Sequence, residues 1–464
     1  MLTAIKNRYI GDKEFYRKLL VIVLPIIIQN TITNFVNLLD NIMVGQVGTD
    51  QMSGVAIANQ ILMIFFLAIF GAMSGAGIFT AQFYGKGDYE GVRHTFMIKF
   101  LIGIIILLIG VFVYGFFGKD LMSLYLTGEG DSADPVATLE YADKYLKVIM
   151  ISFIPIVMTN VYTSTMRESG ETVIPMASGI VEVIINLVFN YFLIFGRCGF
   201  PKLGVVGAAI ATTLSRYIEM SIAMLAGHLD KKKYPYFVHA YRSIKIPVNL
   251  LKNVIIKGTP LLVNETLWSF GIATLTQCYS VKGINVIASL NISQTISQLF
   301  NVVFMSMGNA VAIIIGQKLG ANKFDEAKKD VVKLMFAAVF SCFIMGALLF
   351  VAAPVFPGIY NTSADIKSLA TRFIRISAFC MPLFAFMHCS YFTLRSGGKT
   401  IITFLFDSCY VWVISIPLAF VLTRFTGLPI VPIYFICNFV DIVKCILGYV
   451  LLKKGVWINN VVNE

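Results

Sequence analysis

Charged residues are scarce in this sequence. Asp, Glu, Lys and Arg make up 13% of its 464 residues, about half the fraction that soluble domains carry. Hydrophobic residues make up 57%. This composition excludes an ordinary soluble domain and indicates a polytopic membrane protein. The net charge of +12 comes largely from basic residues in short loops, so we do not expect nucleic acid as a partner.

The motifs of common catalytic and metal centres are also missing. The sequence contains no HExxH, GxSxG or paired CxxC motif, so nothing in it supports hydrolytic or metal-centred catalysis. GGKT at Gly397 has the form of a phosphate-loop end, but no strand precedes it and position 393 is threonine. The eight cysteines lie mostly within apolar stretches, and we expect them to be reduced. We predict neither an enzyme nor a protein with a cofactor.

Uncharged stretches of about 20 residues, the length that a helix needs to cross a hydrocarbon core, recur along the chain. We predict twelve membrane-spanning helices, at residues 17–44, 52–80, 92–117, 139–165, 172–196, 204–228, 248–280, 284–316, 328–352, 368–394, 400–422 and 430–452. Lys and Arg concentrate in the amino terminus, every second loop and the tail. The positive-inside rule then places both termini in the cytoplasm. The predicted fold is therefore an all-α, multi-pass integral membrane protein of the cell membrane.

The sequence also repeats itself. LPIIIQNTITNF at Leu24 is similar to TPLLVNETLWSF at Thr259, an offset of 235 residues. Two further matches support the repeat: Gln82 and Gly85 with Gln317 and Gly320 at the same offset, and TMRESGET at Thr165 with TLRSGGKT at Thr393. We predict two six-helix bundles, residues 1–228 and 248–464, joined by a cytoplasmic linker at 229–247. Six is even, so the halves share one orientation, as in transporters that bind their substrate between parallel repeats.

Polar residues line one face of the first predicted span. Gln29, Thr33, Asn37 and Asp40 follow one another at steps of four, four and three residues, so they share a helical face. Pro25 lies one turn earlier and can bend the helix. An acid within a span costs at least about 2–3 kcal/mol, which suggests a function. The alternative is that Asp40, near the outer end, reaches the headgroup region or water.

Further polar groups lie within other spans. Glu265 is far from both ends of the seventh span, and Asp407 lies about seven residues into the eleventh, roughly 10 Å deep. A carboxylate kept from water can hold a proton at neutral pH, which suits a proton carrier, and one ligated by neutral oxygens suits sodium. The alternative for each is a structural hydrogen bond to a neighbouring helix.

Two more polar faces follow helical spacing: Glu182, Asn186 and Asn190 in the fifth span, and Gln294, Gln298 and Asn301 in the eighth. Thr212 in the sixth span faces either inward or lipid. Basic residues with an acid three residues away are expected to pair along their own helix. These pairs are Asp441 with Lys444 and Arg216 with Glu219.

In its order of segments, the chain resembles the multidrug and toxic compound extrusion (MATE) family. The resemblance extends from Lys18 to about Lys454. It is carried by LPIIIQNTITNFVNLLDNIMVGQVG at Leu24, AQFYGKGDYE at Ala81, GIVEVIINLVFNYFLIFG at Gly179, GVVGAAIATTLSR at Gly204, GQKLGANKFDEA at Gly316 and LRSGGKTIITFLFDSCYVWVISIPLAFVL at Leu394.

The resemblance implies an inner-membrane antiporter that expels organic cations and drugs in exchange for sodium ions or protons. In related members, a carboxylate near the outer end of the first helix takes the coupling cation, helped by polar residues of helices five and six. The matching positions, where Na⁺ would bind in a sodium-coupled member, are Asp40, Asn186, Asn190 and Thr212. Many relatives have aspartate at the position of Asn190, so this site lacks one negative charge. Other members couple through carboxylates of the second half, a role that would fall to Glu265 and Asp407.

We therefore expect a monomeric transporter in the lipid bilayer that works by alternating access, with two bundles rocking about a central cavity. The residues expected to line the cavity or gate it are Pro25, Gln29, Thr33, Asn37, Glu182, Gln294, Gln298 and Asn301. The main alternative is a lipid-linked oligosaccharide flippase of the same superfamily, which should have a strongly cationic cavity for pyrophosphate. A membrane enzyme is a third class, for which no catalytic constellation is visible.

Overall fold

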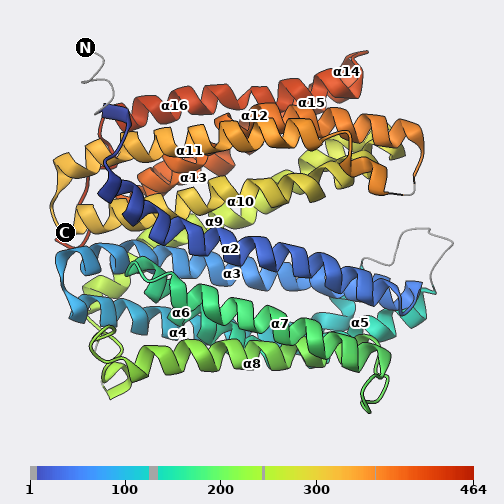
Figure 1. The fold of residues 1–464 in the computed structure, drawn as a ribbon, viewed down its shortest axis with the longest axis horizontal. Helices are drawn as coiled ribbons and strands as arrows, with labels where there is room; N and C mark the ends of the chain where they lie inside the picture. Colours follow the sequence, from blue (N-terminus) through green and yellow to red (C-terminus); the bar gives the residue numbers. More distant parts are fainter. Residues whose placement is uncertain (1–7, 125–133, 243–245, 361, 464) are drawn as a thin grey trace. The chain divides into compact units, whose positions relative to one another are not determined.

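The computed structural model describes residues 8–124, 134–242, 246–360 and 362–463, and all regular elements of this part of the chain are helices (Figure 1). Most predicted spans are single helices: α2 (Lys13–Gly45), α3 (Thr49–Lys86), α4 (Tyr89–Ser123), α7 (Val173–Phe195), α8 (Val205–Leu229), α9 (Val248–Ser280), α10 (Ile284–Gly320), α11 (Phe324–Ala352) and α12 (Ala364–Ser396). The other spans are interrupted: α5 (Pro135–Ile149) with α6 (Phe153–Glu168), α13 (Thr400–Phe404) with α14 (Ile416–Phe425), and α15 (Ile430–Phe439) with α16 (Asp441–Lys453).

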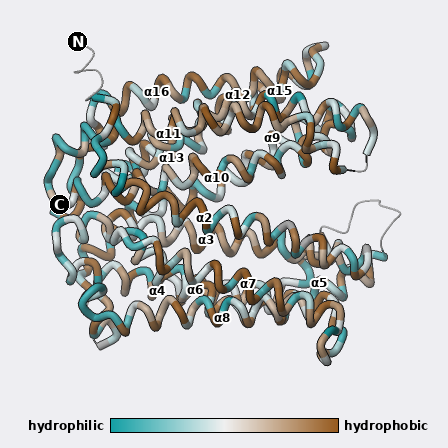
Figure 2. Tube along the Cα trace, viewed as in Figure 1, coloured by the Kyte–Doolittle hydropathy of each residue, from teal (hydrophilic) through white to brown (hydrophobic). Residues whose placement is uncertain are grey.

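These helices have the apolar surface that a bilayer requires. Ten of the described helical segments are long and apolar enough to cross a membrane. Figure 2 shows apolar residues along the helix bodies and hydrophilic residues at many of the turns. Large apolar side chains are exposed, such as Phe116 at 73% and Phe343 at 64%. Water would disfavour so much exposed apolar surface, whereas lipid does not. The prediction of an all-α, multi-pass membrane protein is confirmed.

The chain forms two compact units. Unit 1 consists of Met1–Ile27, Ala81–Gly87 and Ile255–Glu464, and unit 2 consists of Ile28–Thr80 and Asp88–Val254. In unit 1, α12 packs against α10, α11, α15 and α16. In unit 2, α8 packs against α5, α6 and α7, and α4 packs against α5 and α6. Within unit 1, the basic α10–α11 and α12–α13 turns lie at the same end as the carboxyl terminus (Figure 1). Which side of the membrane this end faces remains a prediction.

Repeat-related glycines meet within unit 1, at the ends of α3 and α10. Gly85 lies against the backbone carbonyl of Gln317, and Gly320 lies against that of Gln82. A Cβ atom on either glycine would overlap the carbonyl. The four residues are the pairs that match at the offset of 235 residues, so the contact is reciprocal between the repeats.

Replacing Gly320 by alanine is expected to destabilise the protein by about 1–3 kcal/mol, because a backbone carbonyl must move to admit the methyl group. A Cβ at Gly358 meets open space, so Gly358→Ala is the matched control and should change stability little. The measurement is the thermal unfolding midpoint of each purified variant in detergent. Equal midpoints for the two variants would contradict the close approach.

Candidate functional site

The four residues expected to bind Na⁺ in a sodium-coupled member lie together in unit 2. Asn190 on α7 donates through Nδ2 to Asp40 Oδ1 at 2.8 Å, and the same Nδ2 lies 2.9 Å from Asn186 Oδ1. Asn186 Nδ2 lies 3.1 Å from Thr212 Oγ1 on α8. Asn186 and Asn190 are 4% and 2% exposed. One chain of hydrogen bonds therefore joins α2, α7 and α8 through the four predicted residues.

Exchanging the oxygen and nitrogen of the Asn186 amide gives it a different set of hydrogen bonds. Turned over, its nitrogen donates to Asp40 Oδ2 at 2.9 Å and its oxygen accepts from Thr212 at 3.1 Å. The Asn190 Oδ1 atom is buried and has no hydrogen-bond partner among the described residues. Amides that can turn over offer Asp40 either donors, which stabilise a charged carboxylate, or oxygens, which can ligate a cation.

A second polar layer lies one helical turn away from the first. It comes before Asn186 on α7 and after Thr212 on α8. Ser215 Oγ donates to Glu182 Oε1 at 3.1 Å, and Arg216 Nε lies 3.7 Å from that oxygen. Arg216 Nη1 also lies 2.9 Å from Glu219 Oε2, which confirms the pair predicted along the sixth span. Glu182 thus has a cationic partner. Asp40 forms no ion pair with a basic side chain in the described part of the chain.

The polar face of α2 continues away from Asp40 to Gln29. Arg167 at the end of α6 donates through Nη2 to Gln29 Oε1 at 3.0 Å. Gly179 on α7 lies directly against the Gln29 amide, where a Cβ would come within 2.5 Å of Nε2. Thr33 is half-buried and Asn37 is exposed. Arg167, a partner of Gln29 that the sequence analysis missed, is the repeat equivalent of Arg395 in the matched TMRESGET and TLRSGGKT segments.

The sequence analysis also missed a buried ion pair in unit 2. Lys99 on α4 is fully buried, pairs with Glu168 and lies 3.1 Å from Ser164 Oγ and 3.3 Å from Thr165 Oγ1 on α6. The sequence did offer a signal for this pair, a single lysine within the apolar run MIKFLIG. A lysine inside an apolar helix is expected to be buried, and a buried lysine needs an acidic partner. The pair joins α4 to α6.

The carboxylates of the second half gather in unit 1. Asp407 accepts from Lys444 Nζ at 2.6 Å through Oδ1 and from Asn264 Nδ2 at 3.1 Å through Oδ2. Tyr391 OH donates to Glu265 Oε1 at 3.0 Å and lies 3.3 Å from Asn264 Nδ2. Glu265 and Asp407 are therefore linked through Asn264 and Tyr391, from α9 and α12.

The prediction that Lys444 pairs with Asp441 on its own helix is wrong. Lys444 instead reaches Asp407, which lies in a π-helical turn, Leu405–Cys409. A π-helical turn shifts the side chains that follow it around the helix axis, and such turns occur frequently at functional sites. A second one, Val411–Ser415, follows.

The polar residues predicted on the eighth span lie on α10 in unit 1. Gln294 and Gln298 are exposed, and Asn301 is half-buried. Pro25 is buried within α2 and Pro260 occupies the equivalent position within α9. The cavity-lining or gating role expected of Pro25, Gln294, Gln298 and Asn301 stays a prediction.

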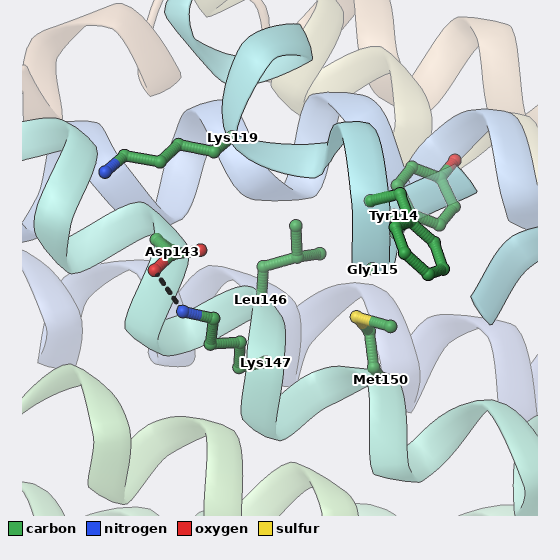
Figure 3. A pocket seen from close by; sticks show the side chains of 8 residues that line it. Tyr114, Gly115, Lys119, Asp143, Leu146, Lys147 and Met150 are labelled. Carbon is green, nitrogen blue, oxygen red and sulfur yellow. Dashed lines mark hydrogen bonds and ion pairs between the residues drawn. The ribbon is translucent and has the colours of Figure 1, made fainter. Parts of the chain in front are cut away.

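A pocket of about 250 Å³ lies in unit 2, between the end of α4 and α5 (Figure 3). Lys119, Asp143 and Lys147 give it charge, and Lys147 Nζ lies 2.6 Å from Asp143 Oδ2. Tyr114, Leu146 and Met150 form its apolar wall. None of the predicted site residues lines it, so we do not assign the coupling cation to this pocket.

Comparison with known proteins identifies the family. The MatE family model matches residues 25–192 and, a second time, residues 260–421. The chain belongs to the MatE family. The two matches start 235 residues apart, from residue 25 to residue 260, which is the offset of the repeat found in the sequence.

Relatives of similar length support the membership in MatE. A probable multidrug resistance protein, YoeA of Bacillus subtilis, is 25% identical over 433 residues, which cover 90% of this chain and 89% of that protein. A probable multidrug resistance protein, NorM of Streptococcus pneumoniae, is 26% identical over 405 residues and 85% of each chain. The fold is that of a solved outward-facing multidrug resistance MATE family transporter, with a TM-score of 0.83, 20% identity, and coverage of 96% of this chain and 97% of that one. The predicted resemblance to MATE transporters is confirmed.

Proposed function

We propose that this MatE member is an antiporter of the cytoplasmic membrane that exports organic cations and drugs in exchange for protons or sodium ions. Relatives with 25% and 26% identity are named as multidrug resistance proteins. The observation that carries the proposal is Asp40, a carboxylate in a spanning helix that is bonded to the neutral amide of Asn190. A carboxylate without a fixed cation can exchange one cation for another.

The proposed coupling step takes place at Asp40. A proton or Na⁺ that neutralises this carboxylate removes its charge–dipole attraction for the amides of Asn186 and Asn190, and either amide can then turn. Thr212 and the two amides offer neutral oxygens, the ligand type that suits Na⁺. A difference of about 1–3 kcal/mol in drug affinity between the two states is enough for ordinary coupling.

Glu265 is the second candidate for the coupling cation. Its contacts include the Tyr391 hydroxyl at 3.0 Å, whereas Asp407 is paired with Lys444. An acid that is ion-paired directly with a lysine, as Asp407 is, is less available to an incoming cation. We therefore rank Asp407 below Asp40 and Glu265 as a candidate coupling residue.

The flippase alternative loses support because three basic residues in the spans are paired with acids. Arg216 contacts Glu182 and Glu219, Lys444 contacts Asp407, and Lys99 contacts Glu168. A pyrophosphate site needs cationic groups whose charge is not already balanced. We also propose that the transporter works as a monomer, since both repeats lie in one chain.

Ethidium transport by the purified protein in lipid vesicles tests the proposal. A proton gradient and a sodium gradient are imposed separately, at clamped membrane potential, with protein-free vesicles as the control. We expect ethidium to move against one of these gradients and the movement to stop when an ionophore collapses that gradient. Transport that ignores both gradients would refute cation coupling, and protein that does not move ethidium or other cationic dyes would refute drug export.

A further inference from the structure

The residues that follow α16 pack into the body of unit 1. We call Gly455–Asn463 the C-terminal segment. Trp457 is 2% exposed, and its carbonyl lies so close to Gly397 that a Cβ there would overlap it. Val461 is also buried and lies against Gly398. The C-terminal segment thus fills the turn between α12 and α13, where only glycine leaves room for it.

Gln82 at the end of α3 holds this segment through its side chain. It is fully buried, and its Nε2 donates to Ser396 O at 2.8 Å and to Asn459 O at 3.2 Å. Its Oε1 accepts from Val461 N at 2.8 Å. Both amide donors are used, so one side chain of the first repeat bridges the end of α12 and the C-terminal segment.

Two more contacts bring other turns into this arrangement. Asn460 Nδ2 lies 3.2 Å from Gly320 O at the end of α10 and 2.6 Å from Asn322 Oδ1 in the α10–α11 turn. Lys86 Nζ lies 2.7 Å from Asn463 Oδ1 at the surface. The C-terminal segment is therefore bonded to α3 of the first repeat and to α10 and α12 of the second, and these turns of unit 1 lie at the same end as the C terminus in Figure 1.

We propose that the C-terminal segment is a latch at this end of the protein and that Gln82 is the positioning residue that ties the first repeat into it. The inference rests on the proposed transport function. Alternating access by movement of one repeat against the other requires the end of α3 to separate from the ends of α10 and α12 when this end opens. A segment hydrogen-bonded to all three must then release α3. The bonds are to neutral backbone and amide groups, which water can replace when the latch opens.

Reversible cross-linking tests whether the latch must open. Cysteines replace the exposed Lys86 and Asn463 in a Cys198→Ser background, because Cys198 is the exposed cysteine of the described chain. A short, cleavable bis-methanethiosulfonate then joins them. We expect ethidium transport to fall more than tenfold and to return after reduction, whereas a monofunctional reagent of similar size leaves it unchanged. Undiminished transport by the cross-linked protein would show that the C-terminal segment stays bound to α3 throughout transport, and it would overturn the proposal.

A second measurement needs no transport and so separates failure of the latch from failure of the proposed function. A cysteine replaces the buried Ser396, and its rate of alkylation by a water-soluble maleimide reports exposure of this end. Gln82→Ala should raise that rate at least fivefold, because three hydrogen bonds are lost at once. Lys86→Ala, which removes one exposed contact, is the matched control and should leave it near the parent value. An unchanged rate in folded Gln82→Ala would overturn the role of Gln82, and the cross-link decides the proposal if that variant does not fold.

Discussion

Replacing Asp40 by asparagine is expected to reduce gradient-driven ethidium transport by up to about 100-fold, the range that a coupling free energy of 1–3 kcal/mol spans. Asparagine keeps the shape of the side chain and can still accept a hydrogen bond from Asn190. It cannot gain or lose a proton, and it has no charge for Na⁺. The variant should therefore fold and bind drug while losing its response to the imposed gradient. Initial transport rates in vesicles, with and without the driving gradient, measure this.

The matched control for Asp40 is Asp120→Asn. Asp120 is exposed at the end of α4, where a carboxylate is solvated and holds no coupling site. Its loss should leave transport within about twofold of the parent rate, since exposed charges contribute little. If Asp40→Asn behaves like this control, Glu265→Gln becomes the deciding variant. Unchanged coupled transport in both Asp40→Asn and Glu265→Gln would show that the coupling residues have been assigned wrongly.

The spans were predictable because their ends carry strong signals. Charged residues and glycines interrupt the apolar stretches, and the observed helices begin and end near these residues. The seventh span, predicted at 248–280, is the observed α9, and the fifth, predicted at 172–196, is α7 from Val173 to Phe195. Boundaries were less accurate where a helix continues past its apolar stretch, as in α10, which runs to Gly320. Hydropathy marks the apolar length, and the hydrogen-bonded helix extends beyond it.

The candidate site was predictable in part. Helical spacing placed Glu182, Asn186 and Asn190 on one face of α7, and all three are buried in the structure. Spacing says which residues share a face, but it does not say which neighbour that face meets. The sequence therefore could not show that Lys444 bonds Asp407, 37 residues away, and not Asp441 three residues away.

The C-terminal segment had no sequence signal at all. Gln82 recognises it through the backbone atoms of Ser396, Asn459 and Val461. Every residue has such atoms, so no residue type marks these partners. The sequence drew attention to Gln82 only through its match with Gln317 in the repeat. That match gave no reason to connect either glutamine with the C-terminal segment.

Breaking the pair of Lys444 and Asp407 is expected to have a large effect on stability. Lys444 is buried, and its side chain is 7% exposed beside an Asp407 side chain that is 19% exposed. Removing one partner leaves the other charge without compensation in a place that water hardly reaches, which costs about 3–5 kcal/mol. Lys444→Gln and Asp407→Asn should each lower the thermal unfolding midpoint in detergent. The double variant should recover most of the loss, since two neutral amides replace a balanced pair.

The same double variant decides whether Asp407 takes part in coupling. If Asp407 serves only to balance Lys444, the double variant should transport ethidium at close to the parent rate, because the acids that exchange cations are Asp40 and Glu265. Lys282→Gln is the matched lysine control, since this amine donates to a backbone carbonyl, Thr426 O, and its loss leaves no carboxylate unpaired among the described residues. A double variant that is no more stable than the worse single variant would contradict the pairing. A double variant that is stable but loses its response to the gradient would return Asp407 to the coupling site.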